Sequence, residues 1–264
     1  MGARRSGFHH QWGVILRGVA AAFLIASVAH SDGRRPLRGA YLEPEPGPFL
    51  LVGFNAYRIA LDGILFRGQP SYRPVEMVVL SPSNAEEAVF VTWREVGRNC
   101  QTDAQVIAVT MAESLESLSQ RNPVASKNRT APIAEVLNHY MALPSAVRVS
   151  SAPIDCASAM KVQDLWETML SSVRYEDERA IVVGGTEYHF VSTAACCRVK
   201  SGMAIDPTPG SLVAEFVAVG TTLFEYARTT IDGREDVKPR LLHRTATLKR
   251  AVQNFRRSGQ AQGV

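Results

Sequence analysis

Residues 75–93 read VEMVVLSPSNAEEAVFVTW, and this stretch decides the fold class. It holds two runs rich in β-branched and aromatic residues, Val75–Leu80 and Ala88–Trp93. Between them lies Ser81-Pro82-Ser83-Asn84, a sequence typical of turns. The pattern predicts two neighbouring strands joined by a short connection.

A second strand pair is expected just before this one. Residues 57–66 read YRIALDGILF, in which apolar residues alternate with Arg58 and Ala60 before Asp62-Gly63. That dipeptide suits a type I′ turn, so Ile64–Phe66 is expected to return as the partner strand. Together with the apolar run 49–54, these patterns predict an antiparallel, β-rich half over residues 49–96.

The rest of the chain predicts mostly helices, with a strand over 146–150 and a hairpin over 180–192 that turns at Gly184-Gly185. Helices are expected where apolar residues recur every three or four positions: Ile107, Met111, Leu115 and Leu118; Ile133, Val136, Leu137, Tyr140 and Met141 after a Thr130 cap; Val162, Leu165, Trp166, Met169, Leu170 and Val173; Leu212, Phe216, Val219, Leu223 and Tyr226 after Thr208-Pro209. Strands followed by helices predict an α+β fold with a single domain over 49–236.

The amino-terminal residues have the features of an export signal. Arg4, Arg5 and Arg17 precede an uncharged run, Gly18–Val28, which is too short to cross a bilayer. Ser27-Val28-Ala29 then offers a small-x-small pattern, with cleavage expected between Ala29 and His30. The chain is therefore expected to be exported, as a periplasmic or secreted protein.

The alternative is an uncleaved anchor in the inner membrane. It would begin at Trp12 and tolerate Arg17 by snorkelling of the side chain toward the headgroups. Residues 30–48, rich in Pro and Gly, are expected to form a linker between this segment and the folded domain.

Charge is distributed unevenly along the chain. The whole sequence carries a net charge of +4, which falls to +1 without residues 1–29, because these hold three arginines and no acid. From Lys238 to the end there are seven basic residues and no acidic residue, so residues 30–237 carry −6. The folded body is therefore acidic, which argues against a nucleic-acid partner.

A basic amphipathic helix is expected over residues 237–257, followed by a disordered tail at 258–264. Its apolar stripe is Leu241, Thr245, Leu248, Val252 and Phe255, and its candidate binding residues are Arg240, Arg244, Lys249, Arg250, Arg256 and Arg257. Such a helix can lie on an anionic membrane surface or meet an acidic protein partner. The narrow stripe, with one aromatic residue, favours a third arrangement, in which the helix docks on the acidic body.

Four cysteines, at positions 100, 156, 196 and 197, are disulfide candidates in an oxidising compartment, and three complete pairings remain open. We expect Cys196 and Cys197 each to join a distant partner, because a bond between neighbours needs a strained ring. Alternatively, the two remain reduced and bind a soft metal or exchange disulfides.

A weaker catalytic pattern lies in the hairpin at 180–192. Alternation places Glu187 and His189 on one face of a strand, where they could form a general base with Cys196, Ser192 or Thr193 as nucleophile. A solvated strand histidine is the expected structure, and no phosphate-binding loop or metal-ligand motif is present, so no cofactor is expected.

These patterns favour a non-catalytic binding or interaction module of the cell envelope, of the exported bacterial type. The alternatives are an exported redox or soft-metal-binding protein that uses Cys196 and Cys197, and a hydrolase that uses Glu187 and His189.

Overall fold

The computed structural model describes residues within the compact unit Leu37–Val264, namely 41–44, 61–82, 84–93, 100, 104–114, 117, 147–173, 185–194 and 198–261. The expected export segment, the apolar run 49–54 and the helix over 130–141 lie outside these residues.

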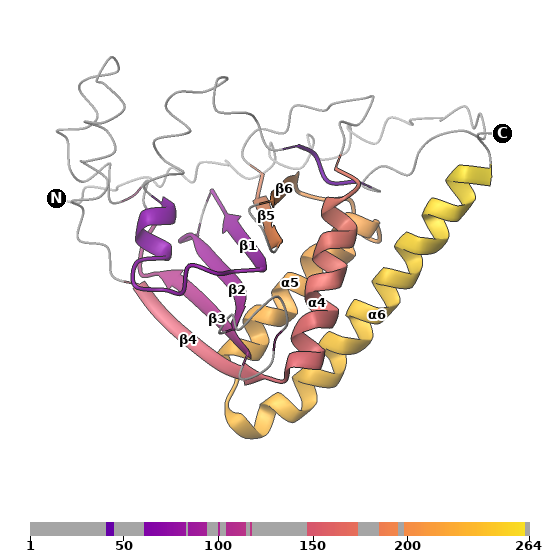
Figure 1. The fold of residues 1–264 in the computed structure, drawn as a ribbon. Coiled ribbons are helices and arrows are strands. Elements are labelled where there is room, and N and C mark those ends of the chain that lie inside the picture. The colour runs from indigo at the N-terminus through magenta and orange to yellow at the C-terminus, as the bar shows by residue number, and fades with distance from the viewer. Residues whose placement is uncertain are drawn as a thin grey trace, which may run out of the picture. The chain divides into compact units, whose positions relative to one another are not determined.

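The described residues form one six-stranded antiparallel sheet with three long helices, so the α+β fold class is confirmed (Figure 1). The strand order is β4-β3-β2-β1-β5-β6. The strands are β1 Val75–Leu80, β2 Glu87–Trp93, β3 Ala104–Met111, β4 Val147–Ile154, β5 Glu187–Ala194 and β6 Arg198–Ile205.

The central strand pair matches the expectation from residues 75–93. Strand β1 has the expected bounds, and β2 begins one residue earlier than expected. The two strands pair antiparallel, with Val75 opposite Val91 and Val78 opposite Ala88.

The helix expected over 107–118 is wrong, because residues 104–111 form β3. This strand is buried on both faces: Val106 and Ala108 belong to one apolar cluster, whereas Ile107, Val109 and Met111 belong to the other. A strand that is apolar at nearly every position also matches a four-residue spacing, so periodicity alone cannot distinguish it from a helix.

The strand pair expected over 57–66 is also wrong for the residues of it that the structure describes, 61–66. Residues 61–65 are helical, and the backbone N–H of Phe66 donates to the Asp62 carbonyl at 3.0 Å. Leu61, Ile64 and Leu65 are buried, because their spacing places them on one face of a helical turn. Asp62-Gly63 therefore lies inside a helical segment instead of in a hairpin turn.

The hairpin expected over 180–192 has a different partner strand. Residues 187–191 form part of β5 as expected, but β5 pairs with β1 on one side and with β6 on the other. Both edges of these residues are therefore occupied by other strands, and the expected partner over 180–183 lies outside the described residues.

Three helices cover the sheet: α4 Cys156–Leu170, α5 Leu212–Arg228 and α6 Ile231–Ala261. The Thr208 cap expected for α5 is wrong, because the helix begins at Leu212 and Ser211 is its N-cap, accepting from the Ala214 N–H at 3.1 Å. Helix α6 is longer at both ends than expected and includes residues 258–261 of the expected tail.

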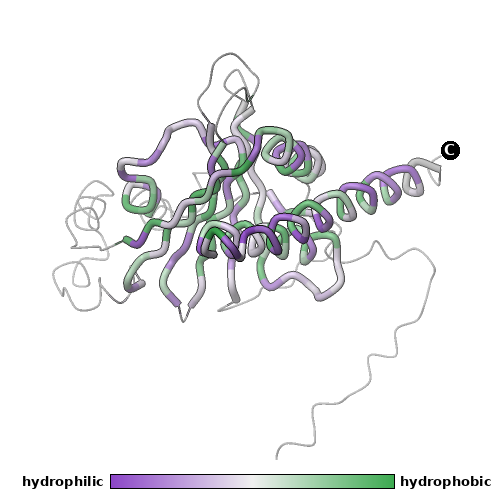
Figure 2. Tube along the Cα trace, turned by 90° about the horizontal axis from the view of Figure 1, so that it is seen from below, coloured by the Kyte–Doolittle hydropathy of each residue, from purple (hydrophilic) through white to green (hydrophobic). Residues whose placement is uncertain are grey.

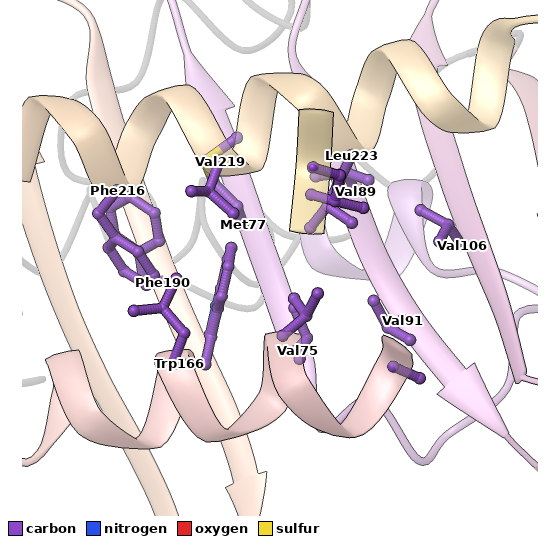
Figure 3. Close-up of a cluster of buried hydrophobic side chains, with 14 of the residues drawn as sticks. Val75, Met77, Val89, Val91, Val106, Trp166, Phe190, Phe216, Val219 and Leu223 are labelled. Atoms are coloured by element: carbon purple, nitrogen blue, oxygen red, sulfur yellow. The ribbon is translucent and has the colours of Figure 1, made fainter. Parts of the chain in front are cut away.

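The main core lies between one face of the sheet and helices α4 and α5 (Figure 3). Trp166 of α4 is fully buried there, with its ring centroid 4.4 Å from that of Phe216 and 6.1 Å from that of Phe190. Helix α5 lies so close to the sheet that a Cβ atom on Gly220 would be 2.3 Å from the Met77 sulfur. Helix α6 packs chiefly on α4 and α5 and forms a third layer.

Part of the expected linker belongs to this body. Leu42 is buried, and Glu43 exchanges two backbone hydrogen bonds with Met203 of β6, at 2.8 and 2.7 Å. Tyr41 packs edge-on against Phe255 of α6, with ring centroids 5.5 Å apart. Residues 41–44 therefore fix the entering chain beside β6 and the second half of α6.

Candidate functional site

The apolar stripe of α6 docks on the body, as its narrow pattern predicts. Leu241, Thr245, Leu248 and Val252 are buried, and the Thr245 hydroxyl donates to the Leu241 carbonyl at 2.8 Å. Figure 2 shows α6 along the outside of the body, with hydrophilic residues spread over much of its length. The face of α6 opposite the stripe is thus left toward solvent.

Several basic residues of α6 hold the docked helix in place. Lys238 pairs with Asp155 at 2.7 Å, Arg240 pairs with Glu225 of α5, and Lys249 pairs with Asp164 of α4. These exposed or half-exposed pairs each contribute little alone, but they join α6 to both supporting helices.

Arg256 anchors the far end of the same interface. Its Nη2 atom donates to the Thr168 carbonyl at 2.6 Å and to the Ser171 hydroxyl at 3.0 Å, and it also contacts Ser172. A guanidinium at the carboxyl end of α4 is favourable, because the last carbonyls of a helix carry partial negative charge.

The remaining basic residues of the candidate set face outward. Arg244, Arg250 and Arg257 are exposed, and so is His243. Among the described residues none of these three arginines has a hydrogen bond or an ion pair. At 100° per residue, Arg250 and Arg257 lie nearly opposite Val252, whereas Arg244 lies on the flank. We call His243, Arg244, Arg250 and Arg257 the basic face.

Asp155 is the acidic group most affected by this interface. It caps α4 by accepting from the Ser158 N–H at 2.9 Å, and it pairs with Lys238. Hydrogen bonds from Lys238 and Ser158 hold the pKa of Asp155 well below its usual range. The carboxylate therefore stabilises the folded chain in its charged form.

Asp155→Ala should lower the free energy of unfolding by about 1 kcal/mol at neutral pH, because an N-cap is lost. Since the folded pKa lies below the unfolded value, this stabilisation is present above pH ~4 and is lost as the pH falls further. Urea unfolding at several pH values should show the gap between wild type and variant closing below that pH. Asp155→Asn, which retains a capping side chain, should lose less; a gap independent of pH would contradict the ionic contribution.

His189 is buried, so the expected solvated histidine is wrong. Its side chain is 2% exposed, and its Nε2 atom lies 3.2 Å from Oε2 of Glu187. The burial follows from the position of β5 inside the sheet, where His189 is flanked by Val78 on β1 and Met203 on β6, both buried. The structure therefore brings Glu187 and His189 together.

The described candidate nucleophiles do not meet this pair. Side chains at positions 189 and 192 point to opposite faces of a strand, and the Ser192 hydroxyl donates to the Pro74 carbonyl at 2.9 Å. Thr193 shares the face of His189 but lies four residues away, about 13 Å along the strand. Its hydroxyl donates to the Arg73 carbonyl at 3.2 Å. The third candidate, Cys196, lies outside the described residues.

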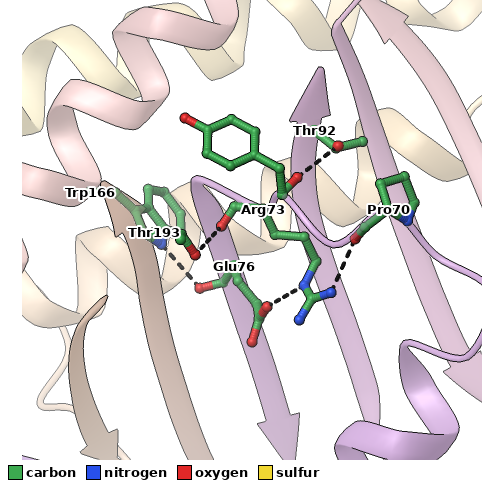
Figure 4. Close-up of polar contacts among 7 residues, drawn as sticks. Pro70, Arg73, Glu76, Thr92, Trp166 and Thr193 are labelled. Carbon is green, nitrogen blue, oxygen red and sulfur yellow. Dashed lines mark hydrogen bonds and ion pairs between the residues drawn. The ribbon is translucent and has the colours of Figure 1, made fainter. Parts of the chain in front are cut away.

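Sequence reasoning missed a second buried polar group on the same face of the sheet (Figure 4). The Arg73 Nε atom donates to the Glu76 carboxylate at 2.7 Å, and its guanidinium lies 4.0 Å from the centre of the Phe66 ring. The sequence contains one indication of this group, because Glu76 is the single acid in the apolar run VEMVVL. A carboxylate buried in such a strand needs a charged or hydrogen-bonding partner. Arg73 also donates to the Pro70 carbonyl, so the group ties β1 to the segment before it.

A disulfide joins Cys100 to Cys156, whose Cα atoms lie 5.4 Å apart. The expectation that Cys196 and Cys197 each bond to a distant cysteine is therefore wrong. Since the chain holds four cysteines, these two have no further cysteine in the same chain other than each other. Both lie outside the described residues, in the connection between β5 and β6.

Comparison with known proteins finds no matching family and no significantly similar curated protein or solved structure. Within the part of the chain that the structure describes, no helix is both long and apolar enough to span a membrane. In the same residues no three His, Cys, Asp or Glu side chains are placed to hold a metal ion.

Proposed function

We propose that this chain is an exported, non-catalytic binding module of the cell envelope, and that the basic face of α6 is its binding surface. The observation that carries the proposal is the division of basic residues on α6. Lys238, Arg240, Lys249 and Arg256 bind to the body, whereas Arg244, Arg250 and Arg257 remain exposed. Docking thus buries the apolar stripe and leaves these three arginines exposed to solvent.

Export is supported by two independent features. The first is the order of basic residues, an uncharged run and small residues over positions 1–29. The second is the disulfide between Cys100 and Cys156, because structural disulfides are typical of oxidising compartments. Binding is favoured over catalysis because Ser192 and Thr193 donate to backbone carbonyls away from His189.

The test uses isolated envelopes from cells that lack this protein and the chain that starts at His30, which retains the whole compact unit Leu37–Val264. Wild-type protein should bind saturably, and Arg244→Gln/Arg250→Gln/Arg257→Gln should lose most of the binding. The matched control is Arg67→Gln/Arg148→Gln/Lys161→Gln, which removes the same charge from exposed positions outside α6 and should bind as wild type does. Equal binding by the α6 variant and the wild type would contradict the proposal.

One observation favours a second candidate, an exported redox or soft-metal-binding protein. Because Cys100 and Cys156 are joined, Cys196 and Cys197 have no other cysteine in the chain but each other, and two neighbouring thiolates would suit a soft cation. A thiol count on protein from the envelope fraction tests this function. Two reactive thiols at these positions would support it, and none would exclude it.

A further inference from the structure

The chemistry of the basic face restricts what it can bind. The exposed residues of α6 from His243 to Ser258 include no large apolar side chain: they are His243, Arg244, Ala246, Thr247, Arg250, Gln253, Asn254, Arg257 and Ser258. Protein interfaces take most of their binding energy from buried aromatic or aliphatic anchors. A face without such anchors suits a surface that is recognised by charge alone.

The arginines also suit phosphate groups. A guanidinium presents two parallel N–H donors that match two phosphate oxygens. Arg250 and Arg257 are seven residues apart, which places their Cα atoms about 10 Å from each other along the helix. They can therefore bind separate phosphates at once.

The docked stripe determines how α6 would lie on a bilayer. An ordinary interfacial helix inserts its apolar face between the lipids. In α6 that face is already buried against α4 and α5, through Leu241, Leu248 and Val252. Contact with a bilayer would thus stay at the level of the headgroups and depend on salt.

We propose that the partner of the basic face is the anionic phospholipid surface of a membrane, with Arg244, Arg250 and Arg257 bound to lipid phosphates. This inference rests on the proposed function and names the partner of the same site. Three acids that lie against α6 do not pair with this face: Asp155, Asp164 and Glu225 are bound by Lys238, Lys249 and Arg240.

The experiment measures binding of the chain that starts at His30 to protein-free vesicles. One set contains phosphatidylcholine alone, and the other contains phosphatidylcholine with phosphatidylglycerol. Wild-type protein should bind the anionic vesicles only, and raising NaCl from about 0.1 M to about 1 M should release it. At about 1 kcal/mol for each arginine near the surface, Arg244→Gln/Arg250→Gln/Arg257→Gln should lower the partition coefficient on the order of 100-fold.

The control Arg67→Gln/Arg148→Gln/Lys161→Gln changes net charge equally and should retain nearly all binding. Equal binding of wild-type protein to neutral and anionic vesicles would overturn the proposal, and so would equal loss in both triple variants. Binding to isolated envelopes but not to anionic vesicles would overturn the lipid partner and leave the proposed function standing, with an acidic protein as its partner. Binding to neither would overturn both.

Discussion

Replacing both Cys100 and Cys156 by serine is expected to lower the free energy of unfolding by about 4 kcal/mol. The disulfide closes a loop of 56 residues, and a crosslink of that span removes much conformational entropy from the unfolded chain. It also joins the segment before β3 to the first turn of α4. Urea unfolding followed by tryptophan fluorescence, without reductant, gives the difference directly.

The matched control is Cys196→Ser/Cys197→Ser, which leaves this disulfide intact and should unfold close to wild type. Reductant should destabilise that control as much as it destabilises the wild-type chain. A loss of less than about 1 kcal/mol in Cys100→Ser/Cys156→Ser would show that the bond does not stabilise the native chain.

Trp166→Ala should cost about 3–5 kcal/mol, the range for removing a large aromatic side chain from a packed core. The indole is fully buried, packs against Phe190 and Phe216, and donates from Nε1 to the Glu76 carbonyl at 3.1 Å. It therefore joins α4, α5 and two strands of the sheet (Figure 3). Thermal or urea unfolding measures the loss.

Trp166→Phe shows how much of the loss depends on keeping an aromatic ring in the core. Phenylalanine retains one six-membered ring in the core but loses the Nε1–H donor and the rest of the indole, so a smaller loss of about 2 kcal/mol is expected. Equal losses in Trp166→Phe and Trp166→Ala would contradict a main contribution from aromatic packing against Phe190 and Phe216.

The sequence predicts those elements whose patterns have one structural solution. The pair β1 and β2 could be placed nearly to the residue, because apolar runs bounded by Ser-Pro-Ser-Asn fit two short strands and little else. The stripe of α6 was equally clear, since its apolar residues recur at helical spacing among many charges.

Other elements were mistaken because local pattern and long-range packing disagree. Strand β3 is apolar on both faces, since the helical residues 61–65 cover the side that α5 does not. The same helical residues carry Asp62-Gly63, whose turn preference was overridden by burial of Leu61 and Leu65. Neither strand β3 nor the helical residues 61–65 can be predicted from about ten neighbouring residues alone.

In the candidate site, too, some features follow from local sequence spacing and others depend on contacts that are distant in the sequence. The helical wheel of α6 predicts which arginines lie opposite the stripe, so Arg250 and Arg257 could be placed on its outer face from spacing alone. The acids that pair with its other basic residues are distant in sequence: Asp155 and Asp164 lie on or beside α4, and Glu225 lies on α5. Burial of His189 likewise depends on strands far away in the chain.

The state of the chain inside the cell gives the most direct test of an exported, oxidised binding module. Protein recovered from fractionated cells is alkylated without reduction, digested and analysed by mass spectrometry. We expect it in the envelope fraction, with the Cys100 and Cys156 peptides linked. A soluble cytoplasmic chain with residues 1–29 intact and both cysteines alkylated would contradict the proposed function.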